Sequence, residues 1–246
     1  MDIHVISIFP EMFAPVLDAG IVGRAQRAGL ATIQAHDLRD HTHDRHRTVD
    51  DAPFGGGPGM VMRPEPLFEA MDAIAPPPGS PVIVLTPQGK RFDQRDAERL
   101  ATASTIVFIC GRYEGIDERA RRGLATEELS VGDYVLTGGE LPTMVMIDSI
   151  IRLLPGALGH GEEAIADDSH TSGLLQYPQY TRPSEYRGES APDVLLSGDH
   201  AAVDKWRRNQ ALRRTLERRP DLLAQADLNK QDLKDLAALG WTPPVE

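Results

Sequence analysis

Three segments of this chain lie at the ends of apolar runs and carry polar side chains, and two of them also contain glycines. Gly111–Asp117 (GRYEGID) comes directly after the apolar run Thr105–Cys110, and three more glycines lie within Ser130–Glu140. A further segment, Leu85–Gln88 (LTPQ), ends another apolar run. Ligands of open α/β sheets bind outside the carboxyl ends of the strands, so these segments would form three walls of one pocket. A simple turn is the alternative for each glycine taken alone.

The densest glycine cluster is Phe54–Met60 (FGGGPGM), whose backbone is free to turn sharply or to pack closely against a flat ligand. It is not a Walker loop, and the pair Gly89-Lys90 elsewhere is followed by Arg91 rather than by Ser or Thr. The first apolar run leads into Pro10 without a dinucleotide-binding glycine fingerprint. The chain therefore lacks the classical nucleotide-binding motifs. The glycine cluster remains either a structural turn or a segment that packs against a flat ligand.

Histidines and carboxylates gather between residues 41 and 51, in the segment HTHDRHRTVDD. Imidazole and carboxylate groups bind several divalent ions. However, Arg39, Arg45 and Arg47 lie in or beside the same segment and would oppose a bound dication. These arginines would instead form ion pairs with the carboxylates or with an RNA phosphate. We therefore assign no metal ligands in this sequence.

Composition is typical of a globular, cytoplasmic protein of 246 residues, with 41% apolar and 26% charged residues. The single cysteine, Cys110, excludes an internal disulfide framework and a four-cysteine zinc site, and it fits a reducing compartment. The sequence shows no basic and apolar leader, and no apolar run approaches the ~18 residues of a membrane span.

The basic residues are concentrated near the end of an otherwise acidic chain, whose formal net charge is −11. Residues 205–219 hold seven Lys or Arg and one acidic residue, Glu217. On a helix, Arg207, Arg214 and Arg218 fall on one face, and Trp206 falls on the opposite half as an expected core anchor. A cationic stripe on an acidic protein suits an RNA backbone, and a solvated surface helix is the alternative.

The order of apolar patterns predicts an α/β fold with a parallel sheet over residues 1–160. Residues 161–172 are small and polar, which predicts a flexible linker, and residues 173–246, which carry the cationic stripe, are expected to form a small, mainly helical domain. The expected strands are Val5–Phe9, Pro81–Thr86 and Thr105–Cys110, and the expected helices are Glu11–Asp18, Pro64–Ala75, Asp93–Ala103, Leu141–Leu154, Asp199–Glu217 and Asn229–Leu239.

Six motifs in this order closely resemble the bacterial tRNA (guanine-N1)-methyltransferases, the TrmD family of SPOUT methyltransferases, which modify guanine at position 37. The motifs are Ile8–Phe13 (IFPEMF), Thr42–Asp51 (THDRHRTVDD), Gly55–Met60 (GGGPGM), Gly111–Asp117 (GRYEGID), Val131–Pro142 (VGDYVLTGGELP) and Val194–Gly198 (VLLSG). The resemblance spans nearly the whole chain. It implies a deep trefoil knot in the α/β domain, S-adenosyl-L-methionine bent into the knot, and an obligate homodimer whose subunits share each active site.

The same resemblance implies which residues bind the ligands. It implies tRNA contact at Gly59, in addition to the charge pattern that predicts contacts at Arg207, Arg214 and Arg218. It also suggests that Mg²⁺ assists methyl transfer, although no ligand of the ion can be named from the sequence. Around the cofactor it places Leu85, Thr86, Pro87, Gln88, Gly111, Tyr113, Glu114, Val131, Gly132, Tyr134, Leu136, Gly138, Gly139 and Pro142.

Methylation at N1 of guanine makes two chemical demands. The nitrogen carries a proton, so a base must remove it, and a cation must stabilise the charge that grows toward O6. The resemblance aligns Asp168 with the catalytic aspartate of the family and Arg152 with its arginine. Without it, they would be interpreted as a solvated linker charge and a surface cation near a helix C-terminus. Asp167 remains a second candidate for the base.

Two other functions stay open at this point. A knotted methyltransferase acting on another RNA position or on ribosomal RNA would share the pocket without needing Asp168 and Arg152. An RNA-binding module whose knot is only structural would need neither the catalytic pair nor the glycines of the pocket, and this chain keeps both.

Overall fold

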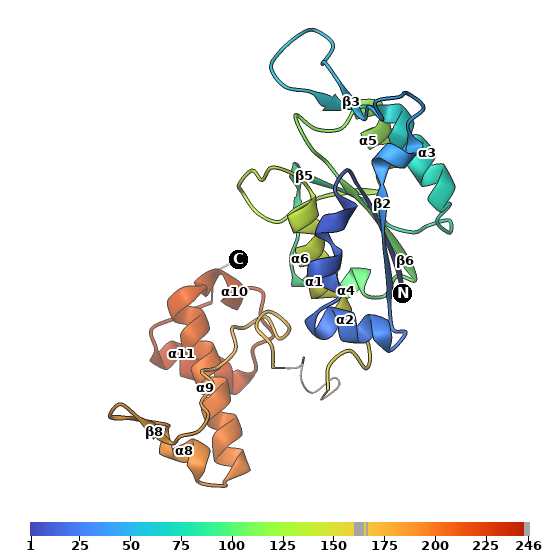
Figure 1. The fold of residues 1–246 in the computed structure, drawn as a ribbon. Helices are drawn as coiled ribbons and strands as arrows, with labels where there is room; N and C mark the ends of the chain where they lie inside the picture. The colour runs from blue at the N-terminus through green and yellow to red at the C-terminus, as the bar shows by residue number, and fades with distance from the viewer. Residues whose placement is uncertain (160–164, 166, 244–246) are drawn as a thin grey trace. The chain divides into compact units, whose positions relative to one another are not determined.

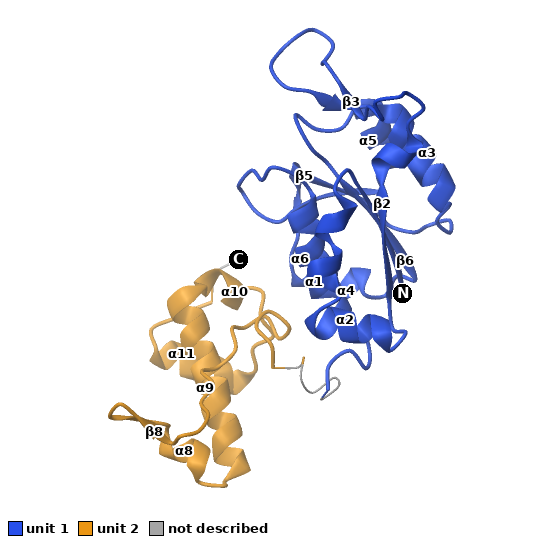
Figure 2. Ribbon diagram, in the orientation of Figure 1, with its two compact units in different colours: residues 1–161 blue, residues 162–246 orange. Residues whose placement is uncertain are grey.

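The computed structural model describes residues 1–159, 165 and 167–243 (Figure 1). The chain divides into two compact units, Met1–Gly161 and Glu162–Glu246 (Figure 2). Of the predicted linker, residues 161–164 and 166 lie outside the described residues. Each unit has its own buried core, and each is treated by itself below.

The first unit is built on a five-stranded parallel sheet in the order β2-β1-β6-β5-β7. Its central strand β6 (Thr105–Cys110) is buried at all six positions, as expected for an apolar strand with helices over both faces. The predicted α/β architecture with a parallel sheet is therefore confirmed. The remaining strands are β1 (Asp2–Ser7), β2 (Thr32–Asp37), β5 (Val82–Arg91) and β7 (Glu127–Ser130).

Helices cover both faces of this sheet, and each face has its own apolar cluster. One cluster includes Ile3, Val5 and Phe108, and the other includes Ile6, Val107 and Ile109, because side chains along a strand alternate between faces. The first face is covered by α1 (Ala14–Leu17), α2 (Gly20–Arg27), α4 (Gln94–Leu100) and α6 (Glu140–Ile151). The second is covered by η2 (Leu38–His41), α3 (Pro64–Ile74) and α5 (Glu118–Leu124).

The prediction of one helix over Glu11–Asp18 is wrong. The chain forms a short 3₁₀ helix, η1 (Pro10–Met12), and then the separate single turn α1. Pro15 has no backbone N–H to donate to Glu11, so a continuous helix would lose that hydrogen bond. The sequence patterns also failed to reveal β2, β7, α2 and α5. Both missed strands carry polar residues and lie at the two edges of the sheet.

The glycine cluster Phe54–Met60 lies in the loop of a small hairpin. Strands β3 (Asp50–Asp51) and β4 (Val61–Met62) pair antiparallel, and the residues between them close the loop. The end of the hairpin is tied to the loop after β6, because Glu114 N–H donates to Met60 O at 2.9 Å and Met62 N–H donates to Gly115 O at 2.9 Å. The hairpin therefore borders the carboxyl edge of the sheet.

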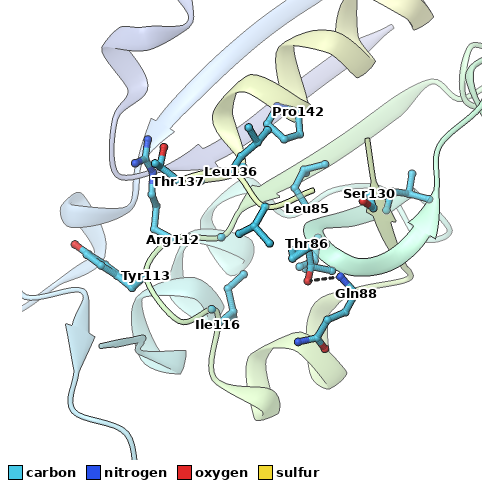
Figure 3. Close-up of a pocket in the computed structure, with 18 of the residues that line it drawn as sticks. Leu85, Thr86, Gln88, Arg112, Tyr113, Ile116, Ser130, Leu136, Thr137 and Pro142 are labelled. Atoms are coloured by element: carbon cyan, nitrogen blue, oxygen red, sulfur yellow. Dashed lines mark hydrogen bonds between the residues drawn. The ribbon is translucent and has the colours of Figure 1, made fainter. Parts of the chain in front are cut away.

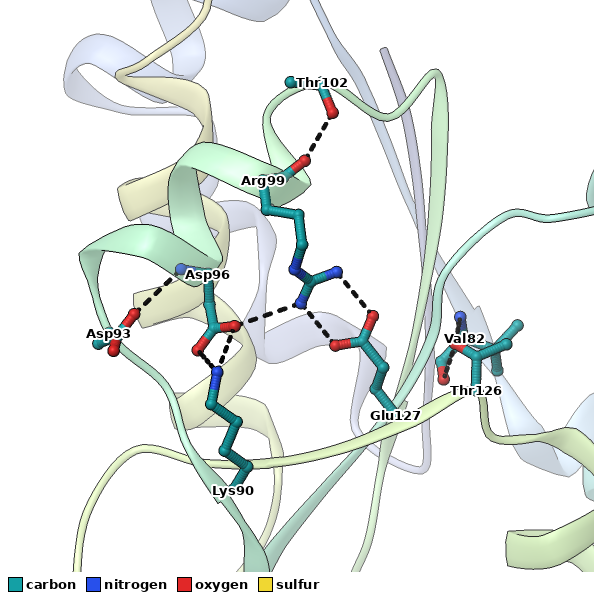
Figure 4. Close-up of polar contacts among 8 residues, drawn as sticks. All are labelled: Val82, Lys90, Asp93, Asp96, Arg99, Thr102, Thr126 and Glu127. Atoms are coloured by element: carbon teal, nitrogen blue, oxygen red, sulfur yellow. Dashed lines mark hydrogen bonds and ion pairs between the residues drawn. The ribbon is translucent and has the colours of Figure 1, made fainter.

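Strand β5 extends to Arg91, beyond its predicted end at Thr86, and pairs with β7 a second time after a shift in register. At this crossing only glycine fits, since a Cβ on Gly89 would lie 2.5 Å from the carbonyl carbon of Glu128. Figure 4 shows the ionic network beside it: Lys90 donates to both Asp96 oxygens at 2.9 Å, and Arg99 bridges Asp96 and Glu127. The network joins α4 to the end of β5 and to β7.

The second unit is mainly helical and has a small core of Leu174, Ala211, Leu212, Leu223 and Leu236. Its longest helix, α9, is capped by the Asp199 side chain, and α11 begins in a capping box between Asn229 and Asp232. Its elements are β8 (Glu185–Tyr186), β9 (Glu189–Ser190), α8 (Asp193–Leu196), α9 (His200–Arg218), α10 (Pro220–Leu223) and α11 (Lys230–Ala238).

Trp206 is not the core anchor that the sequence predicts. It is half-buried, and its ring lies 6.3 Å from the ring of Tyr180 rather than in the cluster around Leu212. Trp241 packs against that cluster instead. Within the described ranges, no helix is both long enough and apolar enough to cross a membrane.

Replacing Asp96 by Asn tests the ionic network beside β5. Burial would raise the pKa of the Asp96 carboxyl, but hydrogen bonds from Lys90 and Arg99 outweigh burial and hold the pKa below its ordinary value. The variant should lose about 1–3 kcal/mol of unfolding free energy at pH 7, because hydrogen bonds to a charged acceptor weaken. This contribution is complete above about pH 4, the unfolded-state pKa, and is lost as pH falls through the lower folded-state pKa.

Urea titrations at several pH values would check this, with Glu98→Gln as the control because Glu98 pairs with Arg95 on the more exposed side of the same helix. A difference between wild type and the Asp96 variant that persists unchanged in acid would contradict an ionic contribution.

Candidate functional site

A cavity of about 420 Å³ lies at the carboxyl ends of β6 and β7 and at the middle of β5, where its register with β7 shifts. Its three walls are residues 84–88 of β5, the loop after β6, and the segment that runs from Ser130 into α6 (Figure 3). Of the fourteen residues predicted around the cofactor, all but Gly132 line this cavity. Gly132 lies next to the wall, where a Cβ would come within 2.5 Å of the Tyr134 ring.

Further lining residues went unnoticed in the sequence. Most belong to the motifs already singled out and could have been found there, whereas Glu118 and Arg121 come from α5, for which no sequence pattern was found. The added residues are Val84, Arg112, Gly115, Ile116, Glu118, Arg121, Leu129, Ser130, Val135 and Thr137.

Gly139 allows two walls of the cavity to meet. It precedes α6 directly, and a Cβ at this position would lie 2.7 Å from Cys110 Cα and 3.1 Å from Leu85 Cβ. Its N–H donates to Gly111 O at 2.9 Å, which joins the start of α6 to the loop after β6. The absence of a side chain at Gly139 therefore determines how closely the walls approach.

A buried ion pair fixes the same loop from the other side. Arg112 Nε donates to Glu140 Oε2 at 2.9 Å, and the Glu140 side chain is only 1% exposed. Glu140 also accepts a hydrogen bond from the Ser7 hydroxyl at 2.7 Å, and the Arg112 guanidinium carbon lies 4.6 Å from the Phe9 ring centroid. Removal of either charge would leave the other buried without its partner, so this pair holds β1, the β6 loop and α6 together.

The opposite rim of the cavity is held by more exposed polar contacts. Gln88 N–H donates to the Thr86 hydroxyl at 3.2 Å, and Arg121 donates to Gln88 Oε1 at 3.3 Å and to Glu128 at 3.0 Å. Such contacts are weaker than the buried pair. This rim can therefore adjust to a ligand more easily than the wall at Gly139.

Cys110 contributes no nucleophile to the cavity. It is fully buried, its sulfur lies 3.3 Å from the Thr143 hydroxyl, and burial raises the pKa of its thiol far above the neutral range. The thiol stays protonated at neutral pH, and the residue acts as part of the core.

Comparison with known proteins identifies the family. A family model described as tRNA (guanine-1)-methyltransferase TrmD matches residues 1–225. The chain belongs to this family.

Close relatives of the TrmD family carry the name tRNA (guanine-N(1)-)-methyltransferase. A protein of Dehalococcoides mccartyi is 51% identical over 236 residues, which cover 95% of each chain. A protein of Chloroflexus aggregans is 52% identical over 247 residues, covering 98% of this chain and 96% of its own, and one of Staphylococcus epidermidis is 53% identical over 232 residues, covering 94% of each.

Membership of the TrmD family implies S-adenosyl-L-methionine as the methyl donor. The cavity fits such a ligand, because its volume lies in the range of about 300–1,000 Å³ usual for small-molecule sites. It also offers both apolar and polar walls, and its glycines let backbone approach the ligand closely.

In the described residues, no group of three or more His, Cys, Asp or Glu side chains is arranged to hold a metal ion. Charged groups in and beside the segment 41–51 have other partners: Arg47 pairs with Asp40, which precedes the segment, and Asp44 accepts hydrogen bonds from the Thr48 N–H and hydroxyl and from His46 N–H. The backbone hydrogen bond from Thr48 is the main cause that lowers the pKa of Asp44.

The remaining predicted site residues do not line the cavity. Arg152 is the C-cap of α6, at the opposite end of that helix from Gly139. Asp168 belongs to the second unit, as do Arg207, Arg214 and Arg218 of α9. Gly59 lies against Glu114, since a Cβ there would meet the Glu114 side chain at 2.4 Å. The glycine cluster therefore packs against one lining residue of the cavity.

Gly139→Ala should weaken binding of S-adenosyl-L-methionine by at least about tenfold, because the new Cβ forces the walls at Cys110 and Leu85 apart. Isothermal titration would measure the affinity. Gly159→Ala is the matched control, because a Cβ there meets no atom within 4 Å. Equal affinities for the two variants would show that this contact does not shape the binding site.

Proposed function

We propose that this protein transfers the methyl group of S-adenosyl-L-methionine to N1 of guanine 37 in tRNA, next to the anticodon. The observation that carries the proposal is the family match over residues 1–225 together with a cavity lined by thirteen of the fourteen residues expected around the cofactor. Relatives at 51–53% identity are named for the same N1 methylation.

In this proposal the cofactor lies against the glycine wall formed by Gly111, Gly138 and Gly139, and Glu114 and Gln88 supply polar groups at the rim. When bound, S-adenosyl-L-methionine supplies an electrophilic methyl group. The trefoil knot that we propose for the first unit would run through this region. The tight crossing of Gly89 over the Glu128 backbone is consistent with it.

Asp168 and Arg152 have the two roles that the chemistry requires in this proposal. Asp168 takes the proton from guanine N1, which makes that nitrogen nucleophilic. Arg152 stabilises the negative charge that develops on O6 as the proton leaves, an interaction that strengthens only toward the transition state. The methyl group is then bonded to N1, and the proton resides on the carboxyl of Asp168.

The position of Arg152 supports an active site shared between two subunits. Gly139 precedes α6 and contributes to the cavity, whereas Arg152 follows the twelve residues of that helix. At 1.5 Å per residue the two ends are about 18 Å apart, which exceeds the reach of an arginine side chain. Arg152 of one subunit would therefore serve the cavity of its partner, and a monomer would have no complete site.

An apolar groove gives the second copy a place to bind. A hollow of about 720 Å³ between α1, α2 and α6 is lined by Val16, Leu141 and Val145, each more than half exposed. Val131, Tyr134, Leu136 and Pro142 line both this groove and the cavity. A partner subunit docked here would approach the bound cofactor directly, as a shared site requires.

Helix α9 supplies the proposed contacts to tRNA phosphates. Arg218 is exposed and Arg214 is half-buried. Arg207 is more constrained, because it pairs with Asp204 at 3.6 Å and its guanidinium carbon lies 5.1 Å from the Tyr177 ring. We therefore assign the main phosphate contacts to Arg214 and Arg218, with Arg207 at the edge of the surface and Gly59 on the loop beside the cavity.

Transfer of labelled methyl groups to tRNA transcripts tests the proposed activity. A transcript with guanine at positions 36 and 37 should accept the label, and replacement of guanine 37 by adenine should abolish the transfer. Asp168→Asn should lower turnover by at least about 10²-fold with cofactor affinity unchanged, because the variant lacks the base. Turnover by this variant close to wild type, with Asp167→Asn inactive, would assign the base to Asp167 instead.

Mixing two inactive variants tests the shared site. At a cofactor concentration well below the dissociation constant of Gly139→Ala, this variant and Arg152→Ala should each have little activity alone. Unfolding and refolding them together should restore about one quarter of wild-type activity, since half the dimers are mixed and each has one intact site. Mixing Arg152→Ala with itself is the control. No gain in the mixed sample, with dimers confirmed by light scattering, would contradict the shared site.

The double substitution of Arg214 and Arg218 by Gln should weaken tRNA binding and reduce the slope of log affinity against log salt by about two, one unit for each lost phosphate contact. Cofactor affinity should not change. Arg27→Gln with Arg95→Gln removes the same charge from exposed positions in the first unit and serves as the control. Parallel salt dependences for wild type and the α9 variant would show that this face does not bind RNA.

A further inference from the structure

The segment that carries Asp168 is packed onto the helices of the second unit. Leu174 is 1% exposed within the core cluster of that unit, and a Cβ on Gly173 would lie 2.9 Å from Ala226 Cα. Leu175 N–H donates to the hydroxyl of Thr215, a buried residue of α9, at 2.9 Å. The backbone on the C-terminal side of Asp168 is therefore anchored to α9.

Short hydrogen bonds fold the segment back on itself. His170 N–H donates to Leu174 O at 2.8 Å, and Gln176 N–H donates to the Ser169 hydroxyl at 2.9 Å. Asp168 N–H donates to Ile165 O at 3.0 Å. These bonds form a compact turn that begins at the proposed catalytic base and ends next to Tyr177.

Tyr177 connects the two ends of this turn. Its hydroxyl donates to Asp167 Oδ2 at 3.0 Å, and the Arg207 guanidinium lies over the face of its ring. Burial, with help from the Asp167 carboxylate, raises the pKa of Tyr177 above its ordinary value. The hydroxyl thus keeps its proton throughout the neutral range and remains a donor.

We propose that Tyr177 is a positioning residue for methyl transfer: its hydroxyl holds the Asp167 carboxylate and so fixes the orientation in which the neighbouring Asp168 meets the guanine. The inference rests on the proposed function, in which Asp168 is the base. In this inference Asp167 acts through its hydrogen bond to the phenol of Tyr177 inside its own unit.

A second consequence concerns α9. Arg207, about two turns before the proposed phosphate contact Arg214 on this helix, lies over the ring of Tyr177. The hydroxyl of Thr215, one residue beyond Arg214, accepts from the segment of Asp168. The helix that we propose to bind tRNA therefore supports the base through both contacts, and the base is positioned by the unit that holds the substrate.

The test compares Tyr177→Phe, Asp167→Asn and the double variant in steady-state methyl transfer. Tyr177→Phe removes only the hydroxyl and keeps the ring under Arg207. Each single variant should lower kcat between about 5-fold and about 100-fold, because a small misplacement of a catalytic group is costly, while KM for tRNA and for the cofactor stays unchanged. The double variant should be no slower than the slower single variant, since Tyr177→Phe removes the same hydrogen bond that Asp167→Asn weakens by removing the charge of its acceptor.

Tyr180→Phe is the matched control, because Tyr180 lies in the same segment and contacts Trp206 rather than Arg207 through its ring. It should keep wild-type kcat, and thermal unfolding of all variants should show that the fold is retained. Wild-type kcat in both single variants, losses that multiply in the double variant, or a loss in KM for tRNA alone would each overturn the inference.

Asp168→Asn in the same assay separates this inference from the proposed function. If Asp168→Asn is active, the assignment of the base fails whatever Tyr177 does. If Asp168→Asn is inactive while Tyr177→Phe and Asp167→Asn match wild type, the base stands and the positioning role of Tyr177 is excluded.

Discussion

The contact between Gly139 and Cys110 is the constraint on which the cavity depends. Backbone meets backbone there with no room for a side chain, so the start of α6 can lie directly on the end of β6 and beside Leu85. The buried pair of Arg112 and Glu140 then holds this arrangement, because neither charge can leave the other without cost. The absence of a side chain at Gly139 and the ion pair of Arg112 with Glu140 thus determine the position of the wall against which a flat ligand would lie.

The same helix that closes the cavity carries Arg152 away from it. Strand ends and helix starts gather at the carboxyl edge of a parallel sheet, and the helix C-termini consequently lie at the opposite edge. Arg152 follows the twelve residues of α6, about 18 Å from the start of that helix. In the proposed mechanism the α/β architecture itself therefore calls for a second subunit, and the exposed apolar side chains between α1 and α6 lie next to the place where that subunit is needed.

The second unit combines binding and chemistry in the proposed function. Its small core is extended by ionic contacts such as the pair of Arg208 with the buried carboxylate of Asp232, which link α9 to α11. The turn that begins at Asp168 packs against α9. In the proposed function, the unit that holds the substrate therefore also carries the base that acts on it.

The sequence by itself determined the central strands, the pocket walls and the family. Buried strands such as Thr105–Cys110 consist almost entirely of apolar residues. The glycines that follow them are required by close backbone contacts, and they stand within short motifs that can be recognised in the sequence. Only the tertiary structure decided the edge strands β2 and β7, whose polar residues find partners far along the chain, as Glu127 does in Arg99. It likewise placed Arg207 over Tyr177 rather than on a free cationic face. Helical periodicity describes a helix alone, whereas the environment of each side chain is set by segments that only folding brings together.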